Sequence, residues 1–214
     1  MQDNRLWDVP TRLFHWVLVL LFGIMWWTAE QGGDWLAWHI RAGLAVLTLV
    51  LFRVVWGLIG SDTARFARFL RGPAAIRRYL AGETAAPGHN PLGGWMVALM
   101  LLVLLVQTGT GLFAADTDSY LFDGPLARFV DASVAERLTG LHEANFNLLL
   151  GLVLLHVGAI FFYRLVKRQN LVRPMLTGRA EQPLQPPALR FAPGWLALVV
   201  FALIGVAVWS LTRI

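Results

Sequence analysis

The sequence predicts an all-α integral membrane protein: a four-helix bundle followed by a fifth, C-terminal transmembrane helix. The chain is 57% hydrophobic and 14% charged, and its mean hydropathy is +0.59. Soluble globular proteins carry about 25% charged residues, so this composition indicates a chain folded in lipid. Five apolar segments are long enough to cross roughly 30 Å of hydrocarbon. They cover residues 13–29, 35–59, 95–113, 138–163 and 193–211.

Two of these segments need justification. The first follows a basic N-terminus, as a signal peptide would, but no small-residue cleavage pattern follows it, so we expect it to be retained. The apolar run of the fourth, 148–162, is too short alone, so this helix should extend back through His142. A Pro/Gln/Gly-rich stretch, 177–187, precedes the last segment. We therefore expect a four-helix core at 1–170, a cytoplasmic linker at 171–192 and a C-terminal transmembrane helix at 193–214.

Charged residues between the spans predict the orientation. Two connecting segments are basic, with Arg65, Arg68, Arg71, Arg77 and Arg78 in one and Arg164, Lys167, Arg168, Arg173, Arg179 and Arg190 in the other. The connection between them is acidic, with Asp116, Asp118, Asp123, Asp131 and Glu136. By the positive-inside rule, we expect the N-terminus to lie in the cytoplasm and the C-terminus outside. This anchoring explains the net charge of +5, so we expect lipid contact and no nucleic-acid binding.

The most informative pattern is the spacing of His142 and His156, fourteen residues apart in one predicted span. Fourteen residues make nearly four helical turns, so both imidazoles share one face, about 21 Å apart along the axis. This is the geometry that holds two stacked haems from one helix. The chain has no cysteine, which excludes disulfides, thiolate iron–sulfur clusters and covalently attached c-type haem. Any haem is therefore of the b type.

Two other histidines can complete the ligand set. In antiparallel helices, His39 shares the outer level with His142, and His15 shares the inner level with His156. Inward-facing side chains build cofactor sites in four-helix bundles in this way. Two alternatives remain. The histidines only hydrogen-bond neighbouring helices in a purely structural anchor, or they relay protons in a haem-free channel or transporter.

Three residues could support the haems, each with an alternative role. Gly43 lies one turn beyond His39, where a missing side chain leaves room for a macrocycle or for helix packing. Arg53, fourteen residues beyond His39, could pair a haem propionate or anchor the cytoplasmic end. Arg12, one turn before His15, has the same two interpretations.

Other polar residues also allow two interpretations. His89 lies in a turn-forming stretch before the third span, where we expect it to stabilise the loop; the alternative is proton transfer near a quinone. Five polar side chains in the third and fourth spans could bond helix to helix, which we favour, or line a quinone pocket. They are Gln107, Thr108, Thr110, Asn145 and Asn147.

These motifs together resemble the bacterial cytochrome b561 family, which includes the b-type cytochrome subunits of nickel–iron hydrogenases. The resemblance covers about residues 5–170. The matching residues are Trp7, Asp8, Arg12, His15 and Trp16 at the start, His39, Gly43 and Arg53 in the second span, Gly88, His89, Asn90, Pro91, Gly93, Gly94 and Trp95 before and at the start of the third, and His142, Glu143, Ala144, Asn145 and His156 in the fourth.

The resemblance implies a bundle that binds two b haems and exchanges electrons with the membrane quinone pool. The expected partner is a c-type cytochrome or a dehydrogenase or hydrogenase subunit. The alternative within the family is a self-sufficient quinone-linked oxidoreductase, such as a superoxide oxidase. The fifth span favours the partnered type, since the minimal members have four helices.

Overall fold

The computed structural model describes residues 4–84, 86–115, 122–181 and 189–213. Four helices in it are long and apolar enough to cross a membrane: α1 (Val9–Gln31), α2 (Trp35–Ile59), α5 (Pro91–Gly111) and α6 (Ala132–Leu165). A shorter apolar helix, α8 (Gly194–Ser210), follows them. The connections contain α3 (Phe66–Phe69), α4 (Pro73–Leu80), η1 (Ala127–Phe129) and α7 (Val172–Thr177). The predicted helical membrane fold is confirmed. Asp116, Asp118 and part of the predicted linker lie outside the described residues.

Three helices, α1, α5 and α6, begin earlier than the apolar pattern predicts, and polar caps extend the first two. The Asp8 side chain accepts a hydrogen bond from the N–H of Thr11 (2.8 Å), so α1 begins at Val9 rather than at residue 13. Asn90 caps α5 in the same way, through the N–H of Gly93 (2.7 Å). Such caps satisfy N–H groups that have no partner inside the helix. The 34 residues of α6 span about 51 Å, so this helix extends beyond the hydrocarbon.

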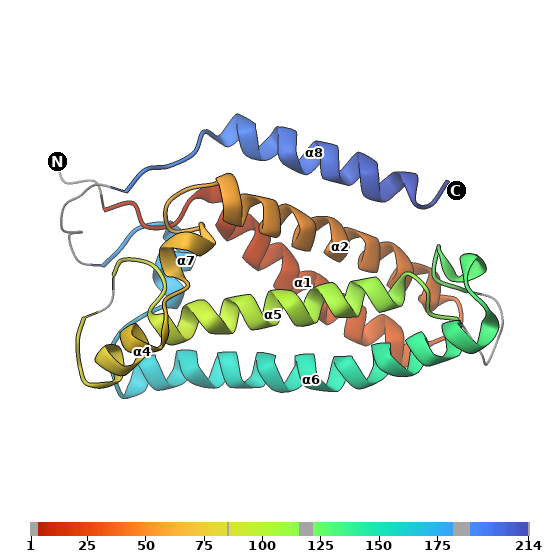
Figure 1. Ribbon diagram of the computed structural model, residues 1–214, viewed down its shortest axis with the longest axis horizontal. Helices are drawn as coiled ribbons and strands as arrows, with labels where there is room; N and C mark the ends of the chain where they lie inside the picture. The colour runs from red at the N-terminus through yellow and green to blue at the C-terminus, as the bar shows by residue number, and fades with distance from the viewer. Residues whose placement is uncertain (1–3, 85, 116–121, 182–188, 214) are drawn as a thin grey trace.

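The four long helices form an antiparallel bundle (Figure 1). α1 packs against α2, α5 packs against α6, and α2 joins the two pairs through α5. We call the end at which α1 and α5 begin the inner end, and the end that holds the α1–α2 turn the outer end, following the predicted orientation. α8 lies outside the bundle, beside α2.

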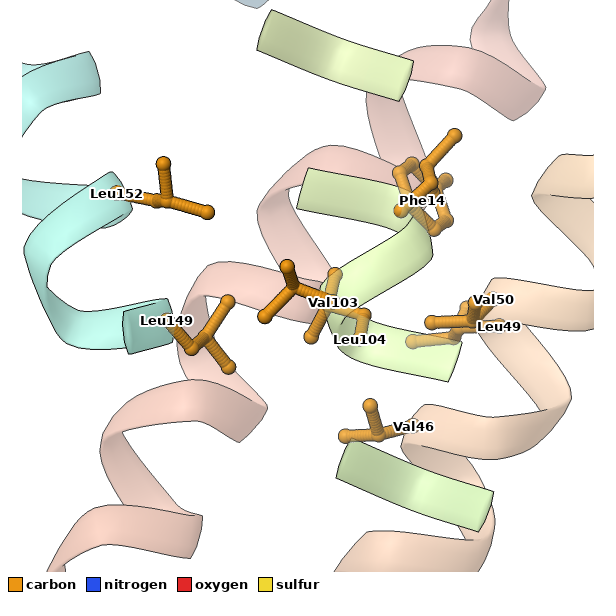
Figure 2. Close-up of a cluster of buried hydrophobic side chains, with 9 residues drawn as sticks. Phe14, Val46, Leu49, Val50, Val103, Leu104, Leu149 and Leu152 are labelled. Atoms are coloured by element: carbon orange, nitrogen blue, oxygen red, sulfur yellow. The ribbon is translucent and has the colours of Figure 1, made fainter. Parts of the chain in front are cut away.

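The middle of the bundle is a closely packed apolar core (Figure 2). All four long helices contribute to it, with Phe14, Val46, Leu49, Val50, Leu101, Val103, Leu104, Leu149 and Leu152. Large apolar side chains also cover the outer faces of the helices, as expected for contact with lipid. Because lipid is as apolar as the core, helix association in a membrane depends on close packing more than on removal of water.

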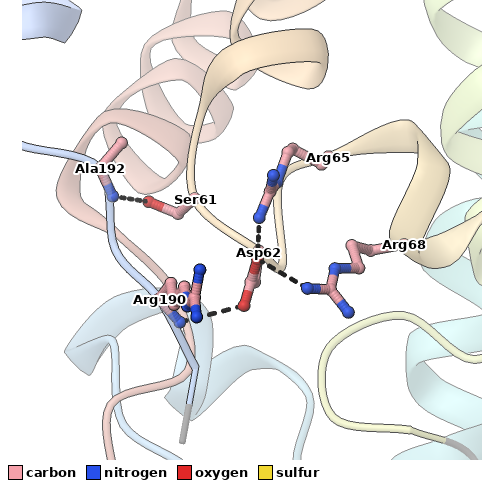
Figure 3. A network of polar contacts seen from close by, with 6 residues as sticks. All are labelled: Ser61, Asp62, Arg65, Arg68, Arg190 and Ala192. Atoms are coloured by element: carbon pink, nitrogen blue, oxygen red, sulfur yellow. Dashed lines mark hydrogen bonds and ion pairs between the residues drawn. The ribbon is translucent and has the colours of Figure 1, made fainter.

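A polar cluster at the inner end ties the chain that enters α8 to the end of α2 (Figure 3). Asp62 accepts the N–H of Arg190 (3.1 Å) and pairs with Arg65 and Arg68, and Ser61 accepts the N–H of Ala192 (3.1 Å). Burial by itself would raise the pKa of Asp62. The Arg190 N–H and the two guanidinium groups outweigh it and hold this pKa below its usual value.

The predicted linker is therefore more structured than its composition suggests. It contains α7, and the N–H groups of Leu6 and Trp7 both bond the carbonyl of Gly178 (2.8 and 3.1 Å). α8 then packs over Phe52 and Trp56 of α2. Its 17 residues span about 26 Å, slightly less than a hydrocarbon layer of about 30 Å. A C-terminal apolar helix is confirmed, and its passage through the membrane stays a prediction.

Candidate functional site

The structure brings the four span histidines together as two facing pairs. The ring centroids of His39 on α2 and His142 on α6 lie 6.2 Å apart, with planes at 78°. Those of His15 on α1 and His156 on α6 lie 6.4 Å apart, with planes at 56°. We call these the outer pair and the inner pair. Val46 and Leu149 of the apolar core lie between the two levels along α2 and α6.

Backbone carbonyls orient the outer pair. Nδ1 of His39 lies 3.0 Å from the carbonyl oxygen of Met25, and Nδ1 of His142 lies 2.9 Å from that of Gln107. Since a carbonyl oxygen only accepts, each Nδ1 carries the proton and each Nε2 keeps its lone pair. This tautomer is the one that binds a metal through Nε2, and the carbonyl contact is the usual support of a ligating histidine.

A cavity of about 700 Å³ surrounds the outer pair, within the size range of cofactor pockets. Gly43 lines it, and its role in leaving room for a macrocycle stays a prediction. Gly111, at the end of α5, also lines it and was not singled out from sequence. A Cβ added at Gly111 would lie 2.9 Å from Cε1 of His142. Only the packing of α5 on α6 reveals this contact, because nothing in the local sequence marks it.

The inner pair has a different environment. The ring of His15 meets Trp16 edge-on, with centroids 4.9 Å apart. Among the described residues, the buried Nδ1 of His15 has no hydrogen-bond partner. Donation from Nδ1 to a backbone carbonyl is therefore seen at both histidines of the outer pair and not at His15.

Two cationic or titratable groups lie close to the inner pair. The Arg53 side chain is 2% exposed, and its guanidinium lies 5.3 Å from the ring centroid of Phe66. His89 packs against the rings of Trp7 (4.8 Å) and Phe69 (4.6 Å). Burial, and then the nearby Arg53 and His156, lower the pKa of His89 to about 3. His89 is therefore a neutral imidazole, held by aromatic contacts as expected of a residue that stabilises its loop.

Arg12 bonds the end of α7, and its contact with a haem propionate stays a prediction. Its Nε donates to the carbonyl of Met175 (3.3 Å), and its terminal nitrogen donates to that of Leu176. The guanidinium thus satisfies the carbonyl end of α7. The backbone that follows α7 passes close by, since a Cβ at Gly178 would lie 2.8 Å from Nη1 of Arg12.

Of the five polar residues of α5 and α6, Gln107 and Asn145 bond helix to helix, as we favoured from sequence, whereas the Asn147 side chain bonds the carbonyl of Glu143 in its own helix. Nδ2 of Asn145 donates to Oε1 of Gln107 (2.6 Å) and to the carbonyl of Val103 (3.1 Å). Nε2 of Gln107 donates to the carbonyl of His142 (3.0 Å). The hydroxyls of Thr108 and Thr110 bond carbonyls of their own helix. Gln107 and Asn145 therefore hold the segment of α6 that carries His142.

The histidine pairs fit a haem iron. A metal–imidazole bond of about 2 Å on each side places two ligating ring centroids about 6.3 Å apart, which both pairs match. Within the described residues, no group of three or more His, Cys, Asp or Glu could hold a bare metal ion. Paired imidazoles suit a metal that brings its own equatorial ligands, as haem does.

Comparison with known proteins agrees with this geometry. The family model for prokaryotic cytochrome b561 matches residues 6–178, which include all four paired histidines. No curated protein and no solved structure matches the chain at a significant level. The match covers most of the chain, and the long apolar helices are those of a multi-pass membrane protein. This chain therefore belongs to the prokaryotic cytochrome b561 family, the b-type cytochromes that bind haem and transfer electrons in membranes.

Proposed function

We propose that this protein binds two b haems, one at each histidine pair, and carries electrons across the bacterial inner membrane. The observation that supports it most is that two imidazoles face each other at each of two levels of the bundle. Their ring centroids lie 6.2 Å apart at the outer pair and 6.4 Å apart at the inner pair. Haem supplies a reversible one-electron iron couple when it is bound. The residues of this chain supply the ligands, their orientation and a low-dielectric surrounding.

Backbone carbonyls orient the two outer histidines for ligation. The Met25 and Gln107 carbonyls keep His39 and His142 in the tautomer whose Nε2 can ligate. Two imidazoles at one haem would leave no position for oxygen, which favours electron transfer over oxygen binding. Val46 and Leu149 keep water out of the space between the two levels.

The route of the electrons follows from the orientation. The Arg and Lys residues between the spans support an orientation with the outer pair on the periplasmic side and the inner pair near the cytoplasm. We infer that a c-type cytochrome or a dehydrogenase or hydrogenase subunit docks at the outer end, and that quinone exchanges electrons at the inner pair. The rate at which quinone oxidises the reduced protein in liposomes, compared between the wild type and His15→Ala, tests the assignment of quinone to the inner pair.

Haem counting tests the ligand assignment. Replacement of any one paired histidine by Ala should reduce the haem content from two per chain to one, since a single imidazole remains at that level. Thr48→Val is the matched control, because Thr48 is buried in α2 and its hydroxyl bonds only the carbonyl of Leu44 in its own helix. A wild-type chain without the absorption bands of b haem after expression with ample haem would refute the proposal.

A further inference from the structure

We propose that Arg53, His89 and Thr11 form a carboxylate site that holds a propionate of the haem at the inner pair, an inference that rests on the proposed function. The described lining of the cavity around the outer pair offers no equivalent site. The two haems would thus differ in how strongly the chain recognises their propionates.

Unpaired polar atoms gather at the inner pair. Among the described residues, the buried atoms without a hydrogen-bond partner include Thr11 Oγ1, His15 Nδ1, Arg53 Nη1 and His89 Nδ1. Thr11 lies one turn before His15 on α1, and His89 interacts electrostatically with both Arg53 and His156. A buried polar group without a partner costs about 1–3 kcal/mol, so such groups in one place indicate a missing polar ligand.

The charge of Arg53 points to an anion as that ligand. Asp8 lies near enough to interact with Arg53 electrostatically, but its two oxygens accept from other donors. Oδ1 accepts the N–H of Thr11 (2.8 Å), and Oδ2 accepts Nε1 of Trp56 (2.9 Å). Asp8 therefore offsets the charge of Arg53 while Nη1 stays free to donate. A guanidinium binds a carboxylate with strong, directional hydrogen bonds.

His89 is suited to a second contact with the same carboxylate. Trp7 and Phe69 hold its ring in place, with centroids 4.8 and 4.6 Å away. A neutral imidazole donates one hydrogen bond, and a carboxylate oxygen accepts it. Gly88 has φ +102°, a conformation that favours glycine. The turn at Gly88 directs the loop before α5 so that His89 lies against the bundle.

The outer cavity provides the contrast. Its described lining contains Glu30 and Glu143 but no Arg or Lys. A propionate there would meet acidic rather than basic side chains, so its charge would add nothing to binding. Propionate recognition should therefore be confined to the inner level, and the outer level serves as a control within the same chain.

The test compares haem b with its dimethyl ester, in which both propionates are neutral. Each is titrated into full-length apoprotein carrying His39→Ala, which leaves only the inner pair, or His15→Ala, which leaves only the outer pair. The absorbance of bound haem gives the dissociation constants. We expect the inner pair to bind haem b at least about tenfold more tightly than the ester, the effect of one or two charge-assisted hydrogen bonds. The outer pair should bind both about equally.

Substitutions then assign the discrimination to residues. Arg53→Gln or His89→Phe, added to the His39→Ala chain, should bring the two dissociation constants together. His89→Phe retains an aromatic ring between Trp7 and Phe69, so it remains informative should Arg53→Gln fail to fold. Arg71→Gln is the control, an exposed arginine at the same end of the bundle.

The outcomes separate this inference from the proposed function. If the His39→Ala chain binds neither haem b nor its dimethyl ester, the ligand assignment at the inner pair fails. If it binds haem and ester equally, the ligand assignment stands and the propionate site is refuted. Discrimination that survives both Arg53→Gln and His89→Phe refutes the site as well.

Discussion

Replacement of Gly111 by Ala should selectively weaken haem binding at the outer pair. The added Cβ would lie 2.9 Å from Cε1 and 3.2 Å from Nδ1 of His142. Ordinary contacts begin near 3.4 Å, so the ring must retreat by about half an ångström, away from the hydrogen bond with the Gln107 carbonyl. Overpacking of this kind costs about 1–3 kcal/mol, which corresponds to roughly 5- to 150-fold weaker binding of the outer haem.

Gly109→Ala is the matched control, two residues earlier in the same helix. A Cβ at Gly109 would meet nothing within 4 Å. Because Ala stabilises a helix interior by about 0.5–1 kcal/mol relative to Gly, this variant should keep both haems and unfold at a slightly higher temperature. The measurements are haem per polypeptide, the dissociation constant at the outer pair in the His15→Ala chain, and thermal unfolding in detergent.

The reasoning would be refuted if the Gly111→Ala chain bound the outer haem as tightly as the Gly109→Ala chain does. It would mean that the His142 ring has room to move without loss of ligation, and that the Gln107 carbonyl does not set its position. Loss of both haems together would instead indicate general unfolding, which the thermal measurement detects.

Three further predictions concern the supporting structure. Gln107→Leu removes the donor to the His142 carbonyl and the acceptor for Asn145 and should destabilise the holoprotein by about 1–3 kcal/mol in detergent unfolding; unchanged stability would contradict it. Because the pKa of Asp62 is held below its usual value of about 3.9, its stabilising contribution should be present above that pH and be lost as pH falls through the lower, folded-state pKa. Asp62→Asn should therefore lower the unfolding temperature at pH 7 but not in strong acid, and an equal loss at both would contradict this. Truncation after Ala192 removes α8 from Phe52 and Trp56, so it should lower the unfolding temperature yet leave two haems per chain, as absorbance will show.

The helices could be predicted from sequence because hydrophobicity and length suffice to define a span. Residues 35–59 were predicted as the structure has them, since polar residues border that apolar run on both sides. The starts of α1 and α5 were predicted four residues late, because Asp8 and Asn90 extend these helices through caps that an apolar pattern does not register. Residues 171–192 were predicted as a linker, and the structure adds α7 within it, held by the distant Arg12.

Like the fold, the candidate site was predicted from sequence only in part. The spacing of His142 and His156, with antiparallel helices, was enough to predict which histidines face each other, because helical periodicity and depth are local properties of the chain. The contact of Gly111 with His142, the placement of His89 near Arg53 and the contact of Arg12 with α7 required the tertiary structure. Each depends on the distance between segments remote in the chain, and that distance is set by how whole helices and loops pack, which no local pattern encodes.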